Sequence, residues 1–219
     1  MKVKKELLDA FMKLSTPTVS DAMDKLGIRG GCEGLMPVVP GKKFVGPAFT
    51  VKFIPVGTVK TKAGDFIDEA EEGDVIVIDN AGRTWCTVWG DILTYVAVKK
   101  KLAGTVIDGV CRDVDGIREL GYPMYTKGNF MVTGKDRVTM ETMNQPISIC
   151  DIQVKPGDLI MCDQSGVLII PLDKAEQILK TAVIIEKTEE KIIQEVKNGS
   201  KLIEARQKLK YDTLQRPEE

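Results

Sequence analysis

Three polar residues between Trp89 and Leu120 are the best candidates for chemistry in this sequence. Asp91 is followed by twenty residues and then by the adjacent pair Arg112-Asp113. Asp113 can bind a hard cation directly or through water, and the Arg112 guanidinium can pair with a carboxylate or stabilise an enolate oxygen. Asp91 can orient Arg112 or a metal-bound water. We therefore predict a site for a small acid whose reaction passes through an enolate.

The start of a predicted helix supplies the other half of this site. Gly90-Asp91 opens a helix expected to run to about Lys101, and first-turn amides lack acceptors within their own helix. With the helix dipole these amides favour a carboxylate or phosphate, so we expect the amides of Gly90, Asp91, Ile92 and Leu93 to bind the substrate carboxylate. An Arg-Asp pair before a helix is also common as simple capping with a surface ion pair, and that interpretation stays open.

The absence of histidine narrows the chemistry further. It excludes Ser–His–Asp and Cys–His catalysis and His-ligated zinc within one chain. A metal held by carboxylate oxygens would be Mg²⁺ or Mn²⁺. The five cysteines are widely spaced without a CxxC pair, which favours free thiols in a reducing compartment. Cys111, beside the proposed site, is either a reactive thiol or a small residue at a strand end.

The elements expected to position these residues follow a strand–helix–strand order. Continuous apolar runs predict strands at Val75–Asp79 and Thr105–Asp108, with the helix of Gly90 between them. A short helix at Val114–Leu120 and a strand at Pro123–Tyr125 follow. This order predicts parallel pairing, in which ligands gather beyond the carboxyl ends of the strands.

The flanking segments complete the prediction of one α/β domain over residues 1–219. We expect an amphipathic helix at 3–14, then a helix with Thr16 as N-cap, Pro17 at its first position and Gly27 at its end. A strand is expected near Phe49–Ile54, a loop at Gly57–Ala63 and a short acidic helix near Asp65–Glu71. Further strands are expected at Ile147–Val154, Leu159–Cys162 and Val167–Pro171. A long C-terminal helix should run from Asp173, as its cap, to about Lys210, interrupted at Asn198-Gly199 and resumed after Ser200.

Composition limits the partners. Lys and Arg are scattered and the formal net charge is −1, so we expect no nucleic-acid partner. No apolar run approaches the roughly 18 residues of a membrane span. We therefore expect a cytoplasmic protein without a membrane partner.

Several motifs, taken in order, resemble the RraA-like family. They are TPTVSDAMDKLG, FVGPAFTV, GDVIVIDN, WGD, GTVIDGVCRDVDGIRELGYPMY and PGDLIMCDQSGVLIIP, and the resemblance runs from about residue 15 to 180. The family includes 4-hydroxy-4-methyl-2-oxoglutarate aldolases with oxaloacetate decarboxylase activity. Its enzymes carry Asp, twenty residues, Arg-Asp, two residues and then an acid. Asp91, Arg112 and Asp113 match this pattern, whereas Gly116 replaces the last acid, with Asp115 and Glu119 nearby.

The resemblance implies a fold, an assembly and residue roles. The fold would be a layered swivelling-domain-like α/β arrangement with a partly parallel sheet, assembled as a homotrimer or a dimer of trimers (a homohexamer) with sites between subunits. Arg112 would contact a 2-oxo acid, Asp113 would hold Mg²⁺ or Mn²⁺, and the Gly90–Leu93 amides would bind the carboxylate. The expected reaction is retro-aldol cleavage or decarboxylation through a pyruvate enolate.

The same family suggests a second function. Some members are regulators that bind and inhibit an RNA-degrading endonuclease, and they typically lack the Arg-Asp pair. The intact Asp91, Arg112 and Asp113 therefore favour a metal-dependent lyase over a non-catalytic regulator. Methyl transfer is disfavoured because no glycine-rich S-adenosylmethionine loop follows an early strand.

Overall fold

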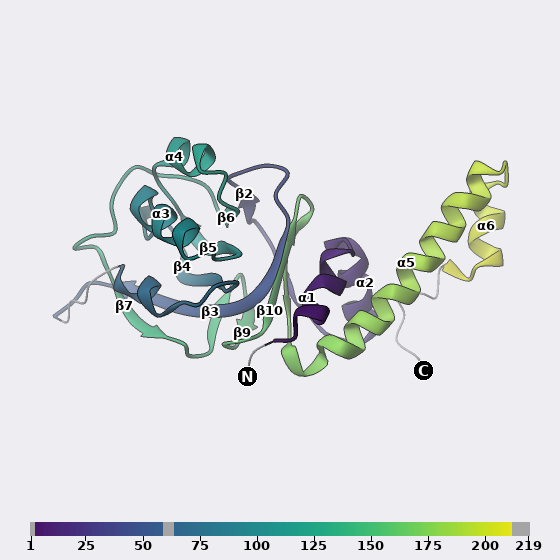
Figure 1. Cartoon of the computed structure of the whole chain (residues 1–219), viewed down its shortest axis with the longest axis horizontal. Helices are drawn as coiled ribbons and strands as arrows, with labels where there is room; N and C mark the ends of the chain where they lie inside the picture. Colours follow the sequence, from purple (N-terminus) through teal and green to yellow (C-terminus); the bar gives the residue numbers. More distant parts are fainter. Residues whose placement is uncertain (1–2, 59–63, 212–219) are drawn as a thin grey trace.

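Four parallel strands form the centre of the sheet, and two of them contain the predicted apolar runs. In the computed structural model, which describes residues 3–58 and 64–211, β3, β4, β5 and β6 pair in that order (Figure 1). Their bounds are Phe44–Pro55, Val75–Thr87, Gly104–Val110 and Met124–Thr126. Helices lie between consecutive strands from β4 to β6, as right-handed crossovers of parallel strands require. The predicted parallel order is confirmed.

Antiparallel strands extend this centre into a nine-stranded, partly parallel sheet. Beyond β3 lie β10, β11 and β1, beyond β6 lies β2, and β7 also pairs with β3. Their bounds are Leu159–Asp163, Gly166–Ile170, Gly31–Cys32, Met36–Pro37 and Val138–Met143. The sequence analysis did not predict β1, β2 or β7. Two of these strands have only two residues, too few to show an alternating pattern.

The expected single strand at Ile147–Val154 is wrong. The segment is a hairpin of β8 (Ile147–Ile149) and β9 (Ile152–Val154). Cys150 and Asp151 have φ angles of 48° and 61°, the left-handed conformation of a two-residue hairpin turn. The hairpin folds its isoleucines onto an apolar cluster of the sheet.

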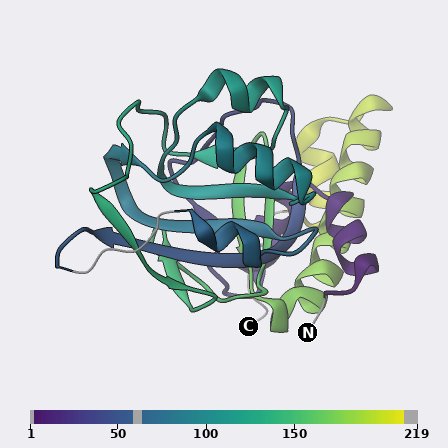
Figure 2. The same ribbon diagram turned by 60° about the vertical axis from the view of Figure 1, so that its left-hand side comes forward.

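Two sets of helices cover the sheet in different places (Figures 1 and 2). One set packs over the parallel strands and the other over β10 and β11. The first contains the 3₁₀ helix η1 (Asp65–Glu69), α3 (Asp91–Lys99) and α4 (Val114–Glu119). The second contains α1 (Lys5–Met12), α2 (Thr16–Lys25) and α5 (Ala175–Lys197), followed by α6 (Leu202–Lys208). The fold is thus the predicted layered α/β class with a long C-terminal helix.

Several predicted helix ends need correction. Ser15, not Thr16, caps α2 by accepting from the Thr18 amide, because the Thr16 amide and hydroxyl both donate to Asp163. The expected helix at 3–14 is shorter at both ends.

At the C-terminus, Asp173 lies within the 3₁₀ turn η2 (Leu172–Lys174), and α5 has no side-chain cap. The predicted break at Asn198-Gly199 is confirmed. Ser200 does not cap α6, however, because its hydroxyl donates to Glu195. Of the expected loop at 57–63, only residues 57 and 58 lie within the described residues.

Strand β4 is much longer than the predicted Val75–Asp79. After Asp79 its register with β5 shifts twice, and Ala81 and Gly82 have φ angles of 49° and 65°. Such a bulge bends a strand without ending it. The bend carries the chain to Thr87 and then directly to the predicted site.

Candidate active site

Three segments meet at the predicted site. The Arg112 amide donates to the Trp89 carbonyl over 3.1 Å, which joins the turn after β5 to the turn after β4. The Thr87 amide donates to Val132 over 3.0 Å, which joins the loop before β7 to the same place. The site is therefore built from backbone contacts between segments that are far apart in the sequence.

Gly90 is the point of closest approach between the predicted residues. It is the N-cap of α3, and a Cβ at this position would lie 2.5 Å from Asp113 Oδ2 and 3.4 Å from Arg112 Nε. Real Cβ atoms do not approach an oxygen so closely. The start of α3 and the Arg112-Asp113 pair therefore meet within one chain, and only glycine permits the contact.

Asp113 holds this arrangement together from a strained backbone position. Its φ of 57° is left-handed, which costs a non-glycine residue about 1–2 kcal/mol. Its Oδ2 accepts from the Asp91 amide and lies 3.3 Å from Arg112 Nε. Both side chains of this ion pair remain more than a third exposed, so they are accessible to a ligand.

Asp91 lies on the side of the site that faces α4. Its Oδ1 accepts from the Ile92 amide at 2.7 Å, and its Cβ is 3.5 Å from where a Gly116 Cβ would be. Gly116, the position at which the resemblance leads us to expect an acid, therefore faces Asp91. Within the described residues, the ion pair of Arg112 is with Asp113, so Asp113 rather than Asp91 orients the guanidinium.

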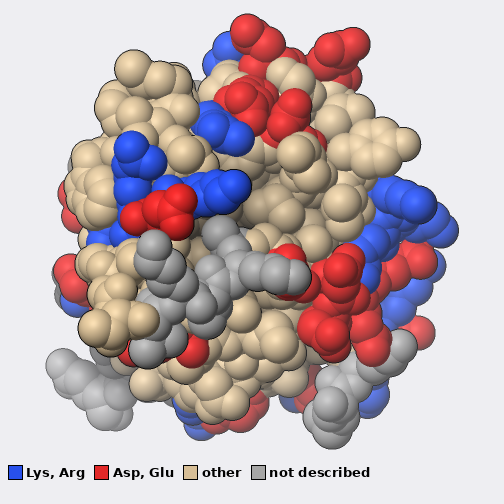
Figure 3. Space-filling model, turned by 90° about the vertical axis from the view of Figure 1, so that its left-hand side faces the viewer, with Lys and Arg blue, Asp and Glu red and all other residues tan. Residues whose placement is uncertain are grey.

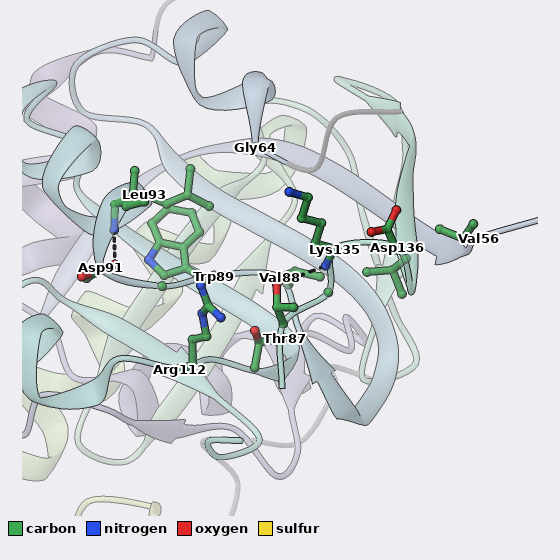
Figure 4. Close-up of a pocket in the computed structure, with 15 residues that line it drawn as sticks. Val56, Gly64, Thr87, Val88, Trp89, Asp91, Leu93, Arg112, Lys135 and Asp136 are labelled. Atoms are coloured by element: carbon green, nitrogen blue, oxygen red, sulfur yellow. Dashed lines mark hydrogen bonds between the residues drawn. The ribbon is translucent and has the colours of Figure 1, made fainter. Parts of the chain in front are cut away.

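A cavity of about 470 Å³ opens beside these residues (Figure 4). Arg112, Trp89 and Leu93 line one part of it, and Lys135 and Asp136 line another. Sequence reasoning missed Lys135, because nothing in the sequence links the loop before β7 to the end of β4. Gly134 was the available signal, because a glycine marks a loop or a close approach of two backbone segments.

Gly134 explains how Lys135 reaches the cavity. A Cβ on Gly134 would lie 2.2 Å from the Thr87 carbonyl oxygen. The backbone of the loop can therefore lie directly on the strand end, and Lys135 lines the cavity from a different segment than Arg112 (Figure 4).

Trp89 is the rigid wall of the cavity. It is buried, stacks on Tyr122 with ring planes 3° apart, and donates its indole N–H to Thr94 over 2.8 Å. Thr94 in turn donates to the Gly90 carbonyl. The start of α3 is thereby fixed to the core. The other tryptophan, Trp85, is half-exposed and does not line this cavity.

Cys111, next to Arg112, is a buried thiol. Burial raises its pKa to about 11, although hydrogen bonding acts in the opposite direction. A thiol with this pKa stays protonated at neutral pH, which favours the structural interpretation of Cys111 over a reactive one.

Two carboxylates, those of Asp113 and Asp91, are the oxygen donors that the site offers to a Mg²⁺ or Mn²⁺ ion. No cluster of three or more acidic, cysteine or histidine side chains suited to a metal occurs in the described part of the chain. Mg²⁺ is commonly bound by one or two carboxylates and keeps several waters. Asp113 is such a carboxylate, and Asp91 lies beside it.

A second hollow, of about 500 Å³, adjoins Asp91 on the side of α4. It is lined by Gly116, Glu119 and exposed apolar side chains: Ile92, Tyr95 and Leu120. Glu119 is one helical turn from Gly116 and shares its face. On the face of the molecule in Figure 3, acidic and basic side chains gather in separate groups around a broad uncharged surface.

Comparison with known proteins identifies the family. The family model described as RraA-like, Aldolase/RraA, matches residues 16–169. The chain belongs to the RraA-like family. The matched region contains β3 to β6, α3 and α4, and so includes every residue of the site. It ends before α5 and α6.

Three proteins that are similar to this chain carry different names. "Protein DlpA" of Legionella pneumophila is 39% identical over 94% of this chain, which spans only 34% of that protein's length. "Putative 4-hydroxy-4-methyl-2-oxoglutarate aldolase" of Halalkalibacterium halodurans is 31% identical over 81% of this chain and 82% of its own. Streptomyces coelicolor RraAS2, described as an unusual member of the RNase ES inhibitor RraA family, aligns with a TM-score of 0.81. It is 29% identical, over 87% of this chain and 96% of its own. In the described residues, no helix is long and apolar enough to cross a membrane.

Proposed function

We propose that this protein is a divalent-metal-dependent carbon–carbon lyase for small 2-oxo acids that carry a second carboxylate. The observation that carries the proposal is that Gly90, Asp91 and Arg112 line one cavity, while Asp113, which is not a lining residue, contacts Gly90 and Arg112. A guanidinium, the Asp91 carboxylate and a helix start therefore surround one small volume. Substrates of this class are 4-hydroxy-4-methyl-2-oxoglutarate and oxaloacetate, which agrees with the name of the H. halodurans relative.

The helix start and Arg112 would bind the 2-oxo acid end of the substrate. Of the four amides predicted to bind it, those of Asp91 and Ile92 already donate to carboxylates. The Gly90 and Leu93 amides are then the donors for the substrate carboxylate. The guanidinium of Arg112, held by Asp113, faces the negative oxygen that develops as the carbon–carbon bond breaks.

Asp113 would hold the metal, with Asp91 beside it. The chemistry that such an ion supplies when bound is Lewis-acid stabilisation of a developing oxygen anion. In a retro-aldol reaction a base must remove the hydroxyl proton of the substrate. Asp91 Oδ1 accepts from Ile92, and we propose that Asp91 Oδ2 takes this proton.

Lys135 would bind the second carboxylate of the substrate. It lines the same cavity as Arg112 from a different segment, so the two cations can bind two anionic groups of one ligand. Replacing Lys135 by Met should raise KM for oxaloacetate several-fold and change kcat less, because the lost contact is distant from the reacting bond. Lys99→Met at the end of α3, outside the cavity, is the matched control.

We also propose that a second copy of the chain covers the hollow next to Asp91. Exposed apolar side chains gather there, with Ile92 75% and Tyr95 64% exposed. Such a patch on α3 suits a subunit contact in a homotrimer or a dimer of trimers. Light scattering on wild type and Tyr95→Glu tests this assembly, and the variant should shift toward smaller species.

The deciding experiment is pyruvate release from both substrates with Mg²⁺, Mn²⁺ or a chelator. We expect activity to disappear on chelation and Arg112→Ala to lower kcat/KM by roughly 100-fold. Arg29→Ala, an exposed arginine that lines neither hollow, is the control. Equal activity in Arg112→Ala and wild type contradicts the proposal. No turnover of any 2-oxo acid, together with a stable ribonuclease complex, replaces it with the regulator function.

A further inference from the structure

Three of the five cysteines gather at one place, where the β8–β9 hairpin packs on the sheet. Cys32 on β1 is in register with Val167 on β11, which is in register with Cys162 on β10. Directly paired residues on neighbouring antiparallel strands face the same side of a sheet. Cys32, Val167 and Cys162 belong to one apolar cluster, and Cys150 in the hairpin turn packs against it.

Cys32 and Cys150 are in direct contact within this cluster. Their side chains are hydrogen-bond partners, and this bond lowers the pKa of Cys150, with Lys127 acting in the same direction against burial and Asp108. The same bond, with burial, raises the pKa of Cys32 far above its ordinary value. Cys150 is thus the more acidic thiol of the pair, and Cys32 keeps its proton.

Two features support Cys150 as the reactive member of the pair. Its side chain is partly exposed, whereas Cys32 is only 8% exposed. Its backbone is fixed in the hairpin turn, with the amide donating to Asp108 Oδ2 over 3.0 Å. Asp108 in turn lies 2.8 Å from Lys127 Nζ, so a positive charge is anchored beside the turn.

The remaining thiols are unlike this pair. Burial raises the pKa of Cys86, Cys111 and Cys162, and Cys162 has no exposed surface. The described residues also contain no set of three or more ligands suited to a metal, which argues against a zinc site at the three cysteines. Two contacting thiols of unequal acidity are instead the arrangement found in reversible dithiols.

We propose that Cys32 and Cys150 are a redox-active pair that hydrogen peroxide converts to a reversible disulfide. The Cys150 thiolate attacks one peroxide oxygen, the O–O bond breaks, and hydroxide leaves as Cys150 becomes a sulfenic acid. The Cys32 sulfur then attacks Cys150, the S–O bond breaks, and water leaves with the Cys32 proton. The two thiols lose two electrons in total, and the peroxide is reduced to two waters. A small dithiol reverses the reaction by thiol–disulfide exchange.

The bond would join the short strand β1 to the β8–β9 hairpin. Both elements lie outside the cavity of Arg112, because neither Cys32 nor Cys150 lines it. The proposal therefore does not depend on the lyase function, and its test needs no activity assay.

The test is peptide mapping of the folded protein after treatment with hydrogen peroxide. Free thiols are alkylated under denaturing conditions, and the protein is digested with trypsin and endoproteinase Asp-N without a reductant. Trypsin leaves the Lys155-Pro156 bond intact, but cleavage before Asp151 and Asp158 separates Cys150 from Cys162, so that Cys32, Cys150 and Cys162 are released in separate peptides with no other cysteine. We expect one linked species, lighter than the two reduced peptides together by two hydrogen atoms, that disappears on treatment with dithiothreitol.

Variants assign the two roles. Cys150→Ser should abolish the linked species and leave Cys32 alkylatable, whereas Cys32→Ala should leave a Cys150 sulfenic acid that dimedone traps. Cys111→Ser, which changes a thiol outside the cluster, should link as the wild type does. Full alkylation of Cys32 and Cys150 in peroxide-treated wild type overturns the proposal. A disulfide that involves Cys162 instead also overturns the proposal. Both outcomes are measured on the wild-type protein, without any substitution.

Discussion

The contact between Gly90 and Asp113 can be disturbed without removing any functional group. In Gly90→Ala the new Cβ would lie 2.5 Å from Asp113 Oδ2, whereas ordinary contacts begin near 3.4 Å. The carboxylate must therefore retreat by about 0.9 Å, and Arg112, paired with it at 3.3 Å, moves as well. The φ of Gly90 is −152°, which alanine adopts freely, so the effect comes from the contact alone.

A displacement of this size should lower kcat/KM strongly and the free energy of unfolding only slightly. Misplacing catalytic groups by about 1 Å can lower rates by roughly 100-fold, which is about 2.7 kcal/mol of transition-state stabilisation. The exposed side chains at the site can shift into solvent, so the free energy of unfolding should change by only about 1 kcal/mol. We therefore expect kcat/KM to fall nearly as far in Gly90→Ala as in Arg112→Ala.

Pyruvate release from oxaloacetate, with a urea titration on the same samples, measures both quantities. Gly64→Ala is the matched control, because Gly64 lines the same cavity and its Cβ would make an ordinary 3.5 Å contact with Leu93. The reasoning is refuted if Gly90→Ala keeps activity within about threefold of wild type while Arg112→Ala loses it.

Three further predictions concern stability and are read from urea titrations. Gly134→Ala should lower the free energy of unfolding by about 1–3 kcal/mol, because its Cβ would lie 2.2 Å from the Thr87 carbonyl oxygen and the backbone there must move. An unchanged urea midpoint would contradict the contact between the loop and β4. Gly116→Ala should stabilise by about 0.5–1 kcal/mol, because alanine favours helix and its Cβ would make only an ordinary 3.5 Å contact with the Cβ of Asp91; a loss of stability would mean that this contact is strained. Thr16→Val should lower the free energy of unfolding by about 1–3 kcal/mol at neutral pH, because valine lacks the hydroxyl that donates to Asp163, and by progressively less in acid.

The pH dependence of the last variant follows from Asp163. Burial raises the pKa of this carboxyl, but hydrogen bonds from Thr16 and Ser165, with Lys43, lower it by more. A carboxyl whose folded pKa lies below its unfolded value stabilises the fold above the unfolded pKa. That contribution is lost as pH falls through the folded pKa. The free energies of unfolding of the wild type and of Thr16→Val should therefore converge in acid. A difference that stays constant with pH would exclude a hydrogen bond from Thr16 to ionised Asp163.

The sequence by itself determined the parallel centre of the fold and the candidate residues. Buried parallel strands are continuous apolar runs, so VIVID and TVID could be recognised from their composition alone. The order of strands and helices then fixed their pairing, and the helix start at Gly90 followed from local signals. Each of these inferences depends on residues close together in the chain.

Only the tertiary structure decided which distant segments touch. The bulge at Ala81-Gly82 extends β4 to Thr87, and the approach of Gly134 to that strand brings Lys135 into the cavity. The hairpin turn at Cys150 likewise brings its sulfur onto Cys32. Such contacts depend on backbone conformation and on packing across more than 40 residues, and periodicity in the sequence reports neither.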